Sequence, residues 1–191
     1  MNSLKIFLNS ISELSEETWK EVFPLFTKVE LSPGDFFVKE NVYAKKIAFL
    51  EEGIIRAFFT NKEAKEYNKQ FFVNASFIGA YSSLLTNEKN KIPQQALSEC
   101  ILWEAKYSDI KKLFKKFHDF EKLGRKIAEY YFLEKERKEL EMALLNATER
   151  YVLFKKSFPN LEQKIPQYHI ASYLGVTATQ LSRLRNKLLK E

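Results

Sequence analysis

The hydrophobic period of the chain changes once along its length, and this change limits the folds that the sequence can adopt. From Thr27 to about Ala105, short runs rich in β-branched and aromatic residues are separated by turn signals such as SPGD at 32–35 and EEG at 51–53. Short strands at such regular spacing predict an all-β roll, barrel or sandwich. From Tyr107 onward the apolar residues recur at the three- and four-residue spacing of helices. We therefore predict an α+β protein in which a β-roll precedes the main helices.

Three shorter helices are expected around the strands and before the C-terminal segment. Ser15 is expected to cap a helix within residues 12–26, because two glutamates follow it and suit the N-terminal dipole. Ser108 is expected to cap a second helix directly after the last strand. A third amphipathic helix is predicted over residues 147–158, where Pro159 ends it.

A single long helix of about seven turns is predicted from about Asp119 to Leu145. Most of its faces are charged, so its apolar residues form only a narrow seam: Phe120, Leu123, Ile127, Tyr130, Tyr131, Leu140 and Leu144. A long helix with a narrow seam usually packs against one partner helix, which predicts a homodimer. The alternative is that the seam packs on the β-domain of the same chain.

The positive charge of the chain is concentrated near its C-terminus. The net charge is +6, and residues 150–191 alone hold 8 basic and 2 acidic residues. A basic segment that coincides with a folded motif favours a polyanionic partner, although a solvated basic surface is the simpler alternative.

Composition excludes several other classes of protein. The single cysteine, Cys100, has no partner for an internal disulfide and is expected to be a buried, inert thiol. No apolar run approaches the ~20 residues needed to span a bilayer, and the N-terminus lacks the pattern of a signal peptide. We therefore expect a cytoplasmic protein without a membrane segment.

The segment IPQYHIASYLGVTATQLSRLR, residues 165–185, predicts a helix-turn-helix. A first helix starts near Pro166, and Gly175 follows it where the chain must turn with a positive φ. Thr177 is a good N-cap for a second helix, whose buried stripe is formed by leucines at three- and four-residue spacing: Leu181, Leu184 and Leu188. An ordinary helical hairpin with a glycine turn is the alternative.

The second helix presents side chains that suit a DNA major groove. Arginine can pair with guanine, glutamine with adenine, and threonine or alanine can touch a thymine methyl. The residues expected to face DNA are Thr177, Ala178, Thr179, Gln180, Ser182, Arg183 and Asn186, with Lys164, Lys187 and Lys190 nearer the backbone. Thr177 and the helix N-terminus beside it are suited to hold a phosphate.

No arrangement of residues predicts an enzyme. The chain has two histidines and five glycines, without a nucleophile elbow or a phosphate-cradling loop. His169 lies in the first helix of the motif, where we expect a role on the surface or against a phosphate rather than in catalysis. No metal site is expected.

Taken over nearly all of its length, the chain resembles the cyclic-AMP receptor (CRP/FNR) family of bacterial transcription regulators. LSPGDFFVKEN and IAFLEEGIIRAFF are similar to the family's β-roll, and the segment around Gly175 and Arg183 is similar to its helix-turn-helix. The resemblance implies a cyclic-nucleotide-binding-like, jelly-roll-like domain at residues 1–118, a dimerisation helix at 119–146, and a winged-helix-like helix-turn-helix at 147–191. Because few residues follow the second helix here, no further β-wing is expected.

The resemblance also implies where a ligand would bind, and here the sequence departs from the family. Members that bind cyclic nucleotides carry a Gly-Glu pair and, about ten residues later, an arginine for the cyclic phosphate. This chain has Gly79 followed by Ala80, and near Asn90 only Lys91 is basic. We therefore expect no useful affinity for cyclic AMP or cyclic GMP, and no cofactor.

A ligand of another kind would be expected against aromatic side chains of the roll and the long helix: Phe71, Phe72, Phe77, Ile78, Tyr81, Tyr130 and Tyr131, beside Gly79, Ala80 and Lys91. These side chains have an alternative role, which is simply to fill the roll.

The function predicted from these features is that of a dimeric DNA-binding transcription regulator with a degenerate nucleotide pocket. Its expected partners are a palindromic double-stranded operator, a second copy of the chain and RNA polymerase. The alternative is a small-molecule sensor whose helix-turn-helix is vestigial or contacts a protein.

Overall fold

The computed structural model describes residues 2–188 of the chain. Its helices are α1 (Asn2–Ile11), α2 (Glu16–Val22), α3 (Tyr81–Thr86), α4 (Tyr107–Lys116), α5 (His118–Leu144), α6 (Ala147–Ser157), α7 (Gln167–Leu174) and α8 (Ala178–Leu188), with 3-10 turns η1 (Phe23–Leu25) and η2 (Leu161–Gln163). Its strands are β1 (Thr27–Leu31), β2 (Phe36–Val38), β3 (Lys46–Glu52), β4 (Ile55–Thr60), β5 (Glu66–Phe72), β6 (Ser76–Ile78), β7 (Gln94–Ala96) and β8 (Cys100–Lys106).

These elements gather into two compact units. The first unit is built from the chain up to Ala57 and from the segment Phe71–Tyr131. The second unit combines the segment Phe58–Gln70, which is the outer part of the β4–β5 hairpin, with the chain from Phe132 onward. The boundaries expected after residues 118 and 146 stay a prediction.

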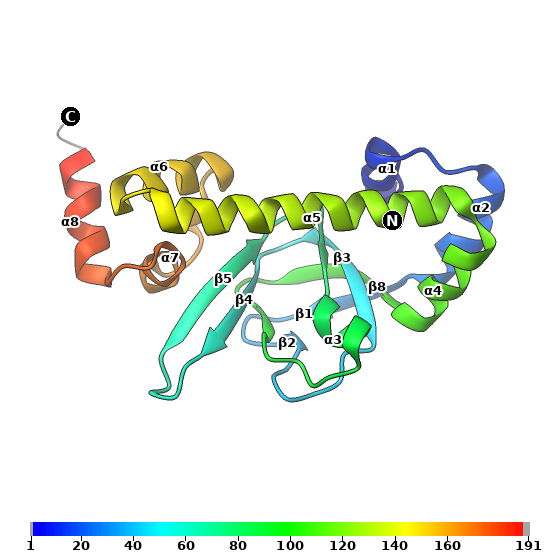
Figure 1. Ribbon diagram of the computed structural model, residues 1–191, viewed down its shortest axis with the longest axis horizontal. Coiled ribbons are helices and arrows are strands. Elements are labelled where there is room, and N and C mark those ends of the chain that lie inside the picture. Colours follow the sequence, from blue (N-terminus) through cyan, green and yellow to red (C-terminus); the bar gives the residue numbers. More distant parts are fainter. Residues whose placement is uncertain (1, 189–191) are drawn as a thin grey trace. The chain divides into compact units, whose positions relative to one another are not determined.

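Two four-stranded antiparallel sheets form the predicted β-roll (Figure 1). Their strand orders are β1-β8-β3-β6 and β2-β7-β4-β5. Both sheets contribute to one buried cluster, which consists of Ala48, Leu50, Ile55, Ile78, Ala96, Cys100 and Leu102. Cys100 is a free, buried thiol, as expected, and burial raises its pKa. The strand-like period of the sequence therefore identified the roll correctly.

The turn between β3 and β4 requires a glycine at position 53. Gly53 has a φ of 112°, a region that side-chain-bearing residues rarely adopt. A Cβ atom there would lie 2.5 Å from both the Cys100 Sγ atom and the Glu99 carbonyl oxygen. The close approach of β8 thus leaves no room for any other residue.

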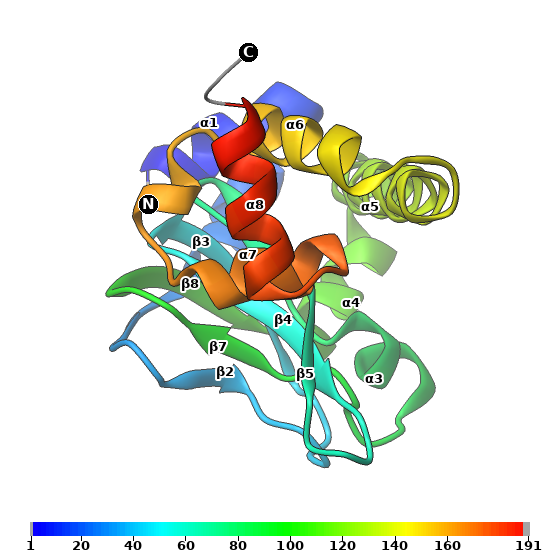
Figure 2. The ribbon, with the colours of Figure 1, turned by 90° about the vertical axis from the view of Figure 1, so that its left-hand side faces the viewer.

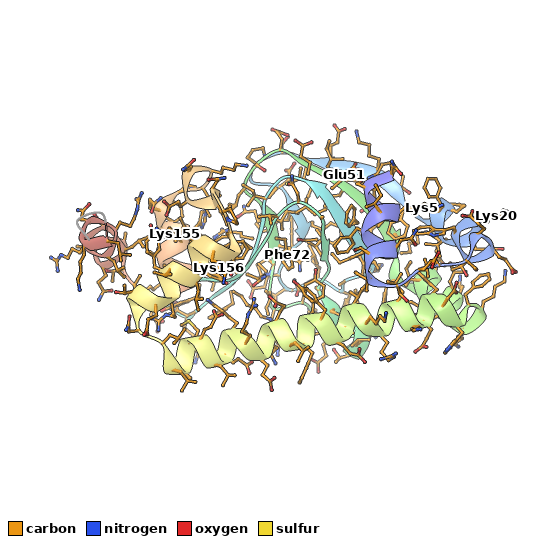
Figure 3. The ribbon with its side chains drawn as sticks, turned by 90° about the horizontal axis from the view of Figure 1, so that it is seen from above. Lys5, Lys20, Glu51, Phe72, Lys155 and Lys156 are labelled. Atoms are coloured by element: carbon orange, nitrogen blue, oxygen red, sulfur yellow. The ribbon has the colours of Figure 1, made fainter. Side chains whose placement is uncertain are left out.

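Helices cover one side of the roll. The side chains of α1, α2, α4 and the start of α5 share a second cluster, which includes Leu4, Leu8, Trp19, Val22, Phe49, Ile110, Leu113, Phe120 and Leu123. Helix α1 was not predicted, although Leu4 and Leu8 have the i, i+4 spacing of a buried face. Figure 3 shows Glu51 beside α1, where its carboxylate accepts hydrogen bonds from the Ser3 hydroxyl and, at 2.8 Å, from Trp103 Nε1.

The two predicted caps of short helices have opposite outcomes. Ser15 caps α2, because its Oγ atom accepts from the Thr18 amide. Ser108 does not cap α4, which begins one residue earlier at Tyr107 with Lys106 at the N-cap position. The reason is that Tyr107 is buried, and its amide donates to the Lys45 carbonyl oxygen at 2.9 Å, so the chain turns directly from β8 into the helix.

The long helix α5 starts and ends within one residue of the predicted bounds. Its first half packs on the first unit, where Phe120 and Leu123 are buried and Ile127 lies against the same cluster. Four large apolar residues further along are mostly exposed: Tyr130, Leu133, Leu140 and Leu144. The start of the seam therefore packs within the chain, and the homodimer expected along the rest of the helix stays a prediction.

The second unit is helical apart from its hairpin segment. Within it, α6 runs back beside the C-terminal half of α5, and α8 lies across α7 (Figure 2). Its buried residues come from α6, η2, α7 and α8 and the segments between them: Tyr151, Phe154, Leu161, Ile165, Ile170, Ala171, Leu174 and Leu181. This arrangement is the predicted C-terminal helical domain.

No helix among residues 2–188 is long and apolar enough to cross a membrane. Within the same residues, no group of three or more histidine, cysteine, aspartate or glutamate side chains is arranged to hold a metal ion.

The carboxylate of Asp119 ties the start of α5 to α2. It accepts hydrogen bonds from the Ser15 amide and from the hydroxyl of the fully buried Thr18, both at 2.8 Å. Burial raises the pKa of Asp119, but these hydrogen bonds and one from the Phe120 amide outweigh burial and lower it.

We expect Asp119→Ala to lower the free energy of unfolding by about 1–3 kcal/mol, because two donors lose a charged acceptor. The measurement is urea unfolding at neutral pH, with Asp109→Ala as the control, since Asp109 pairs only with the exposed Lys112 among the described residues. The wild-type advantage should disappear as the pH falls through the lowered pKa of Asp119. Equal losses in both variants would contradict this role.

Candidate nucleic-acid interface

The turn between α7 and α8 depends on Gly175. This residue has a φ of 70°, and its amide and that of Val176 donate back to the carbonyl oxygens of Ser172 and Ala171 at 3.3 and 3.0 Å. These bonds satisfy two of the carbonyl groups in the last turn of α7, where the chain reverses direction. A Cβ atom at Gly175 would also lie 3.0 Å from the Met142 side chain of α5. The predicted glycine turn is therefore present in the structure.

The helix pair has its own small core. Ile170, Leu174 and Leu181 are almost completely buried. Arg150 of α6 fastens this core, because its Nε atom donates to the Leu174 carbonyl oxygen at 3.1 Å and its Nη1 atom donates to the Leu145 carbonyl oxygen. The last carbonyl of α7 thus receives a charged donor.

Helix α8 begins with a reciprocal cap between Thr177 and Gln180. The Gln180 amide donates to Thr177 Oγ1 at 3.2 Å, and the Thr177 amide donates to Gln180 Oε1 at 2.8 Å. This is a capping box, in which a threonine and a glutamine three residues later satisfy each other's amides. Thr177 was the predicted cap, whereas its partner Gln180 was not predicted, although the spacing T-x-x-Q is the signal for such a pair.

The capping box changes the role expected for Gln180. This side chain is exposed, as predicted, but its amide oxygen is already bonded to the Thr177 amide. A bidentate pair with adenine needs both the oxygen and the nitrogen of the side chain. Gln180 can therefore pair with adenine in that way only if the cap opens.

Most of the other predicted contact residues lie on one exposed face of α8. The exposed residues are Ala178, Thr179, Ser182, Arg183, Asn186 and Lys187, together with Thr177 just before the helix. Within residues 2–188, Arg183, Asn186 and Lys187 make no hydrogen bond or ion pair with another side chain. Arg185 is turned back toward Glu162, whose carboxylate lies 4.0 Å away. Lys164 is exposed, and Lys190 lies outside the described residues.

The expected surface role of His169 is wrong. Its side chain is buried, and the side-chain amide of Asn68 on β5 lies 3.2 Å from its Nδ1 atom and donates to its carbonyl oxygen at 3.1 Å. The Asn68 amide donates to Ser172 Oγ at 2.9 Å, and that hydroxyl donates to the Glu66 carbonyl oxygen at 2.9 Å. These four bonds fasten the outer part of the β4–β5 hairpin to α7.

A cleft of about 370 Å³ opens beside this attachment. Lys65 and Glu66 of the hairpin segment line one side of it, and Thr177 and Ala178 line the other. Tyr168, which is exposed, also borders it. The hairpin segment thus lies near the N-terminal end of α8, a neighbourhood that the sequence did not indicate.

The residues predicted to line a ligand site are only partly brought together. Gly79 and Ala80 lie where β6 leads into α3, and the side-chain amide of Gln94 donates to the Gly79 carbonyl oxygen at 3.1 Å. Tyr81 is exposed, and its hydroxyl accepts from the Tyr107 hydroxyl at 3.4 Å. Lys91 is exposed.

The aromatic residues of this set are mostly engaged in packing. Phe72 lies among the strands of the roll and packs against its buried cluster (Figure 3). The Tyr131 hydroxyl donates to the Phe77 carbonyl oxygen at 2.9 Å and accepts from the Phe77 amide at 3.0 Å. Tyr130 is exposed and meets the ring of Tyr131 edge-on. The structure thus gives a packing role to Phe72, Phe77 and Tyr131.

Comparison with solved structures identifies the architecture. The chain is similar to CLP, a c-di-GMP responsive global regulator from Xanthomonas campestris, at 15% identity over 92% of each chain with a TM-score of 0.72. It is also similar to FixK2 from Bradyrhizobium japonicum (16% identity, 86% of this chain and 85% of that chain, TM-score 0.74). A transcriptional regulator assigned to the CRP/FNR family from Eubacterium rectale matches with 14% identity, 100% and 89% coverage, and a TM-score of 0.75.

The chain has the CRP/FNR fold. Neither a protein-family model nor a curated protein sequence matches it. The similarity therefore lies in the arrangement of the β-roll, the long helix and the helical C-terminal unit.

Within this CRP/FNR fold, the segment expected to hold a nucleotide phosphate is occupied by its own polar groups. The buried side chain of Asn90 donates to the carbonyl oxygens of Lys39 and Ile92, both at 3.0 Å, and accepts from the Ile92 amide at 3.1 Å. An amide that is satisfied by the backbone offers neither the charge nor the forked donors of an arginine.

We expect Gln180→Ala to destabilise the start of α8, because the Thr177 amide loses its acceptor. The cost of a lost cap of this kind is about 0.5–2 kcal/mol. Amide hydrogen exchange at Thr177 should become faster, whereas Gln180→Glu should preserve the protection because its carboxylate can accept the same bond.

Thr179→Ala is the matched control, because Thr179 is exposed on the same turn and takes no part in the cap. Unchanged exchange at Thr177 in Gln180→Ala would show that the capping box contributes nothing in solution.

Proposed function

We propose that this chain is a DNA-binding transcription regulator that acts as a homodimer. The observation that carries the proposal is the exposed face of α8, where Arg183, Asn186 and Lys187 have no partner among residues 2–188 although the helix itself is held in a buried, capped core. Exposed donors on a rigid helix are what base and phosphate recognition requires.

Charge supports the same partner. Residues 150–191 hold 8 basic and 2 acidic residues, and one of those acidic residues, Glu162, lies near Arg185. Two of these eight basic residues, Lys155 and Lys156, are exposed on the last turn of α6 (Figure 3). A surface with this excess of positive charge attracts a polyanion at long range.

The proposal assigns different tasks to the residues of α8. Arg183 reads a guanine edge, and Ala178 and Thr179 at the start of the helix make apolar or hydroxyl contacts with bases. Thr177 and Lys187 contact phosphates. Gln180 holds the helix start and meets DNA through its remaining side-chain nitrogen.

Dimerisation would occur along α5. Leu133, Leu140 and Leu144 expose 60, 53 and 75% of their surface, which is costly for leucines that face only water. Two reading helices one DNA turn apart would gain affinity and select palindromic sites. Since the proposed partner is DNA, we place the protein in the cytoplasm. We propose no catalytic role for it. Contact with RNA polymerase stays a prediction.

Replacing Arg183 with alanine should weaken binding to a selected palindrome by about 1–3 kcal/mol per half-site and relax the preference at one base pair. Lys187→Ala should weaken binding to all sequences alike and reduce the salt slope by about one unit for each lost phosphate contact. The experiment is a titration against a palindrome selected from a random pool and against unrelated DNA, at two salt concentrations.

Lys122→Ala on the exposed surface near the start of α5 serves as the control and should change neither affinity nor slope. Equal loss of affinity for both DNAs in Arg183→Ala would make this residue a backbone contact. Wild-type protein that binds neither DNA at low salt would overturn the proposed function and favour a sensor whose helix-turn-helix contacts a protein.

We also propose that neither cyclic AMP nor cyclic GMP is the effector. Ala80 and the self-satisfied Asn90 leave the expected ribose and phosphate positions without a carboxylate and a guanidinium. Isothermal calorimetry with either nucleotide should give no heat of binding at micromolar concentrations. A saturable signal in that range would mean that other residues of the roll hold the nucleotide.

A further inference from the structure

The exposed seam of α5 contains one charged residue. The apolar positions Tyr130, Leu133, Leu140 and Leu144 follow the alternating spacing of three and four residues that defines a coiled-coil seam. The position that completes this spacing between Leu133 and Leu140 is occupied by Arg137. A single polar residue in such a seam selects the register of pairing, at a cost in stability.

Arg137 is held by two carboxylates of its own helix. Its Nη2 atom lies 2.6 Å from Glu134 Oε2, and its Nε atom lies 3.6 Å from Glu141 Oε1. The Arg137 side chain nevertheless remains 59% exposed. A guanidinium has five N–H donors, so these two contacts leave donors for a further partner.

Three glutamates border Arg137 on the seam, although Lys138 also lies 3.8 Å from one of them, Glu141. Glu134, Glu136 and Glu141 all lie within four residues of it on α5. A second copy of the helix, placed in the same direction and register, would bring its own Arg137 close to these carboxylates. The Arg137 of the first copy would likewise lie close to the glutamates of the second. The surface is thus complementary in charge to a copy of itself, whereas a shift by one heptad would place Arg137 against Tyr130 or Leu144.

We propose that Arg137 selects in-register pairing of two copies of this chain along α5. The proposal rests on the homodimer of the proposed function and adds the residue that determines how the copies pair. The leucines on either side supply the buried apolar area, and Arg137 makes every other register bury a guanidinium against an apolar side chain. The two arginines of the paired copies repel each other, and the surrounding glutamates offset this repulsion.

The first test reverses the charge. Arg137→Glu would place two glutamates among the six carboxylates of the paired helices, so we expect its homodimer to be at least about tenfold weaker than wild type in sedimentation equilibrium. The protomer should remain folded, because Arg137 itself is 59% exposed and surface ion pairs of this kind are worth about 0–1 kcal/mol each. Lys135→Glu is the matched control, because Lys135 is equally exposed, pairs with Glu139 in the same helix and lies outside the seam.

The second test mixes chains. A mass-tagged Arg137→Glu chain combined with wild type should form the heterodimer in preference to either homodimer in native mass spectrometry, since an arginine then faces a glutamate. A loss of dimer caused by misfolding would not be restored in this way. The Lys135→Glu chain should mix with wild type statistically.

A third variant tests the register itself. Arg137→Leu should tighten the dimer and permit shifted pairing. In wild type, a cysteine at position 144 (Leu144→Cys) should form a disulfide with its copy, and the buried Cys100 should not interfere. With Arg137→Leu added, this cross-link should fall as shifted pairs appear.

The outcomes separate the two proposals. A wild-type chain that remains monomeric at micromolar concentration would remove the homodimer, and the role of Arg137 with it. A wild-type dimer whose affinity is unchanged by Arg137→Glu, without preferential heterodimers, would leave the homodimer standing and overturn the role of Arg137.

Discussion

The structure depends on the packing of the few apolar side chains of one long, mostly charged helix. Helix α5 has 27 residues, and only Phe120 and Leu123 in it are fully buried. Intrinsic helix propensity contributes little to the stability of such a polar helix, so most of its stability comes from the side chains that pack against it. Near its start the partner is the helical cover of the roll, and further along Tyr131 bonds to both backbone groups of Phe77. The exposed leucines beyond lie on another face: at about 3.6 residues per turn, Leu140 is two and a half turns from Tyr131 and so on the opposite side of the helix.

The C-terminal half of α5 also fixes the helix-turn-helix within the second unit. The Lys138 ammonium lies 3.7 Å from the centre of the Tyr173 ring on α7, and burial lowers the pKa of Lys138 to about 8. Burial also raises the pKa of Tyr173. Met142 approaches Gly175 from the same helix, and Arg150 of α6 bonds the last carbonyl of α7. The orientation of α7, and of α8 beyond its short turn, is therefore determined by contacts outside the motif.

Local signals were sufficient to predict much of this architecture. The roll, the long helix and the helix-turn-helix each have a period or a turn residue that is visible within a few positions, as at Gly175 and Thr177. The burial of His169 could not be predicted in this way, because its partner Asn68 lies 101 residues earlier in the chain. The start of α4 at Tyr107 was missed for a similar reason, since packing of that side chain outweighed the capping preference of Ser108.

The predicted interface was less complete than the predicted fold, because exposure of a polar residue does not mean that its hydrogen-bonding atoms are free. Gln180 is exposed yet bonded to the start of its own helix, and Arg185 is turned toward Glu162. The side chains that remain for direct recognition are few, chiefly Arg183 and Asn186. A helix with so few free donors distinguishes DNA sequences weakly by itself. If the chain is a regulator as proposed, selectivity must come from joining two such helices, which makes the pairing of α5 as important to recognition as the reading helix.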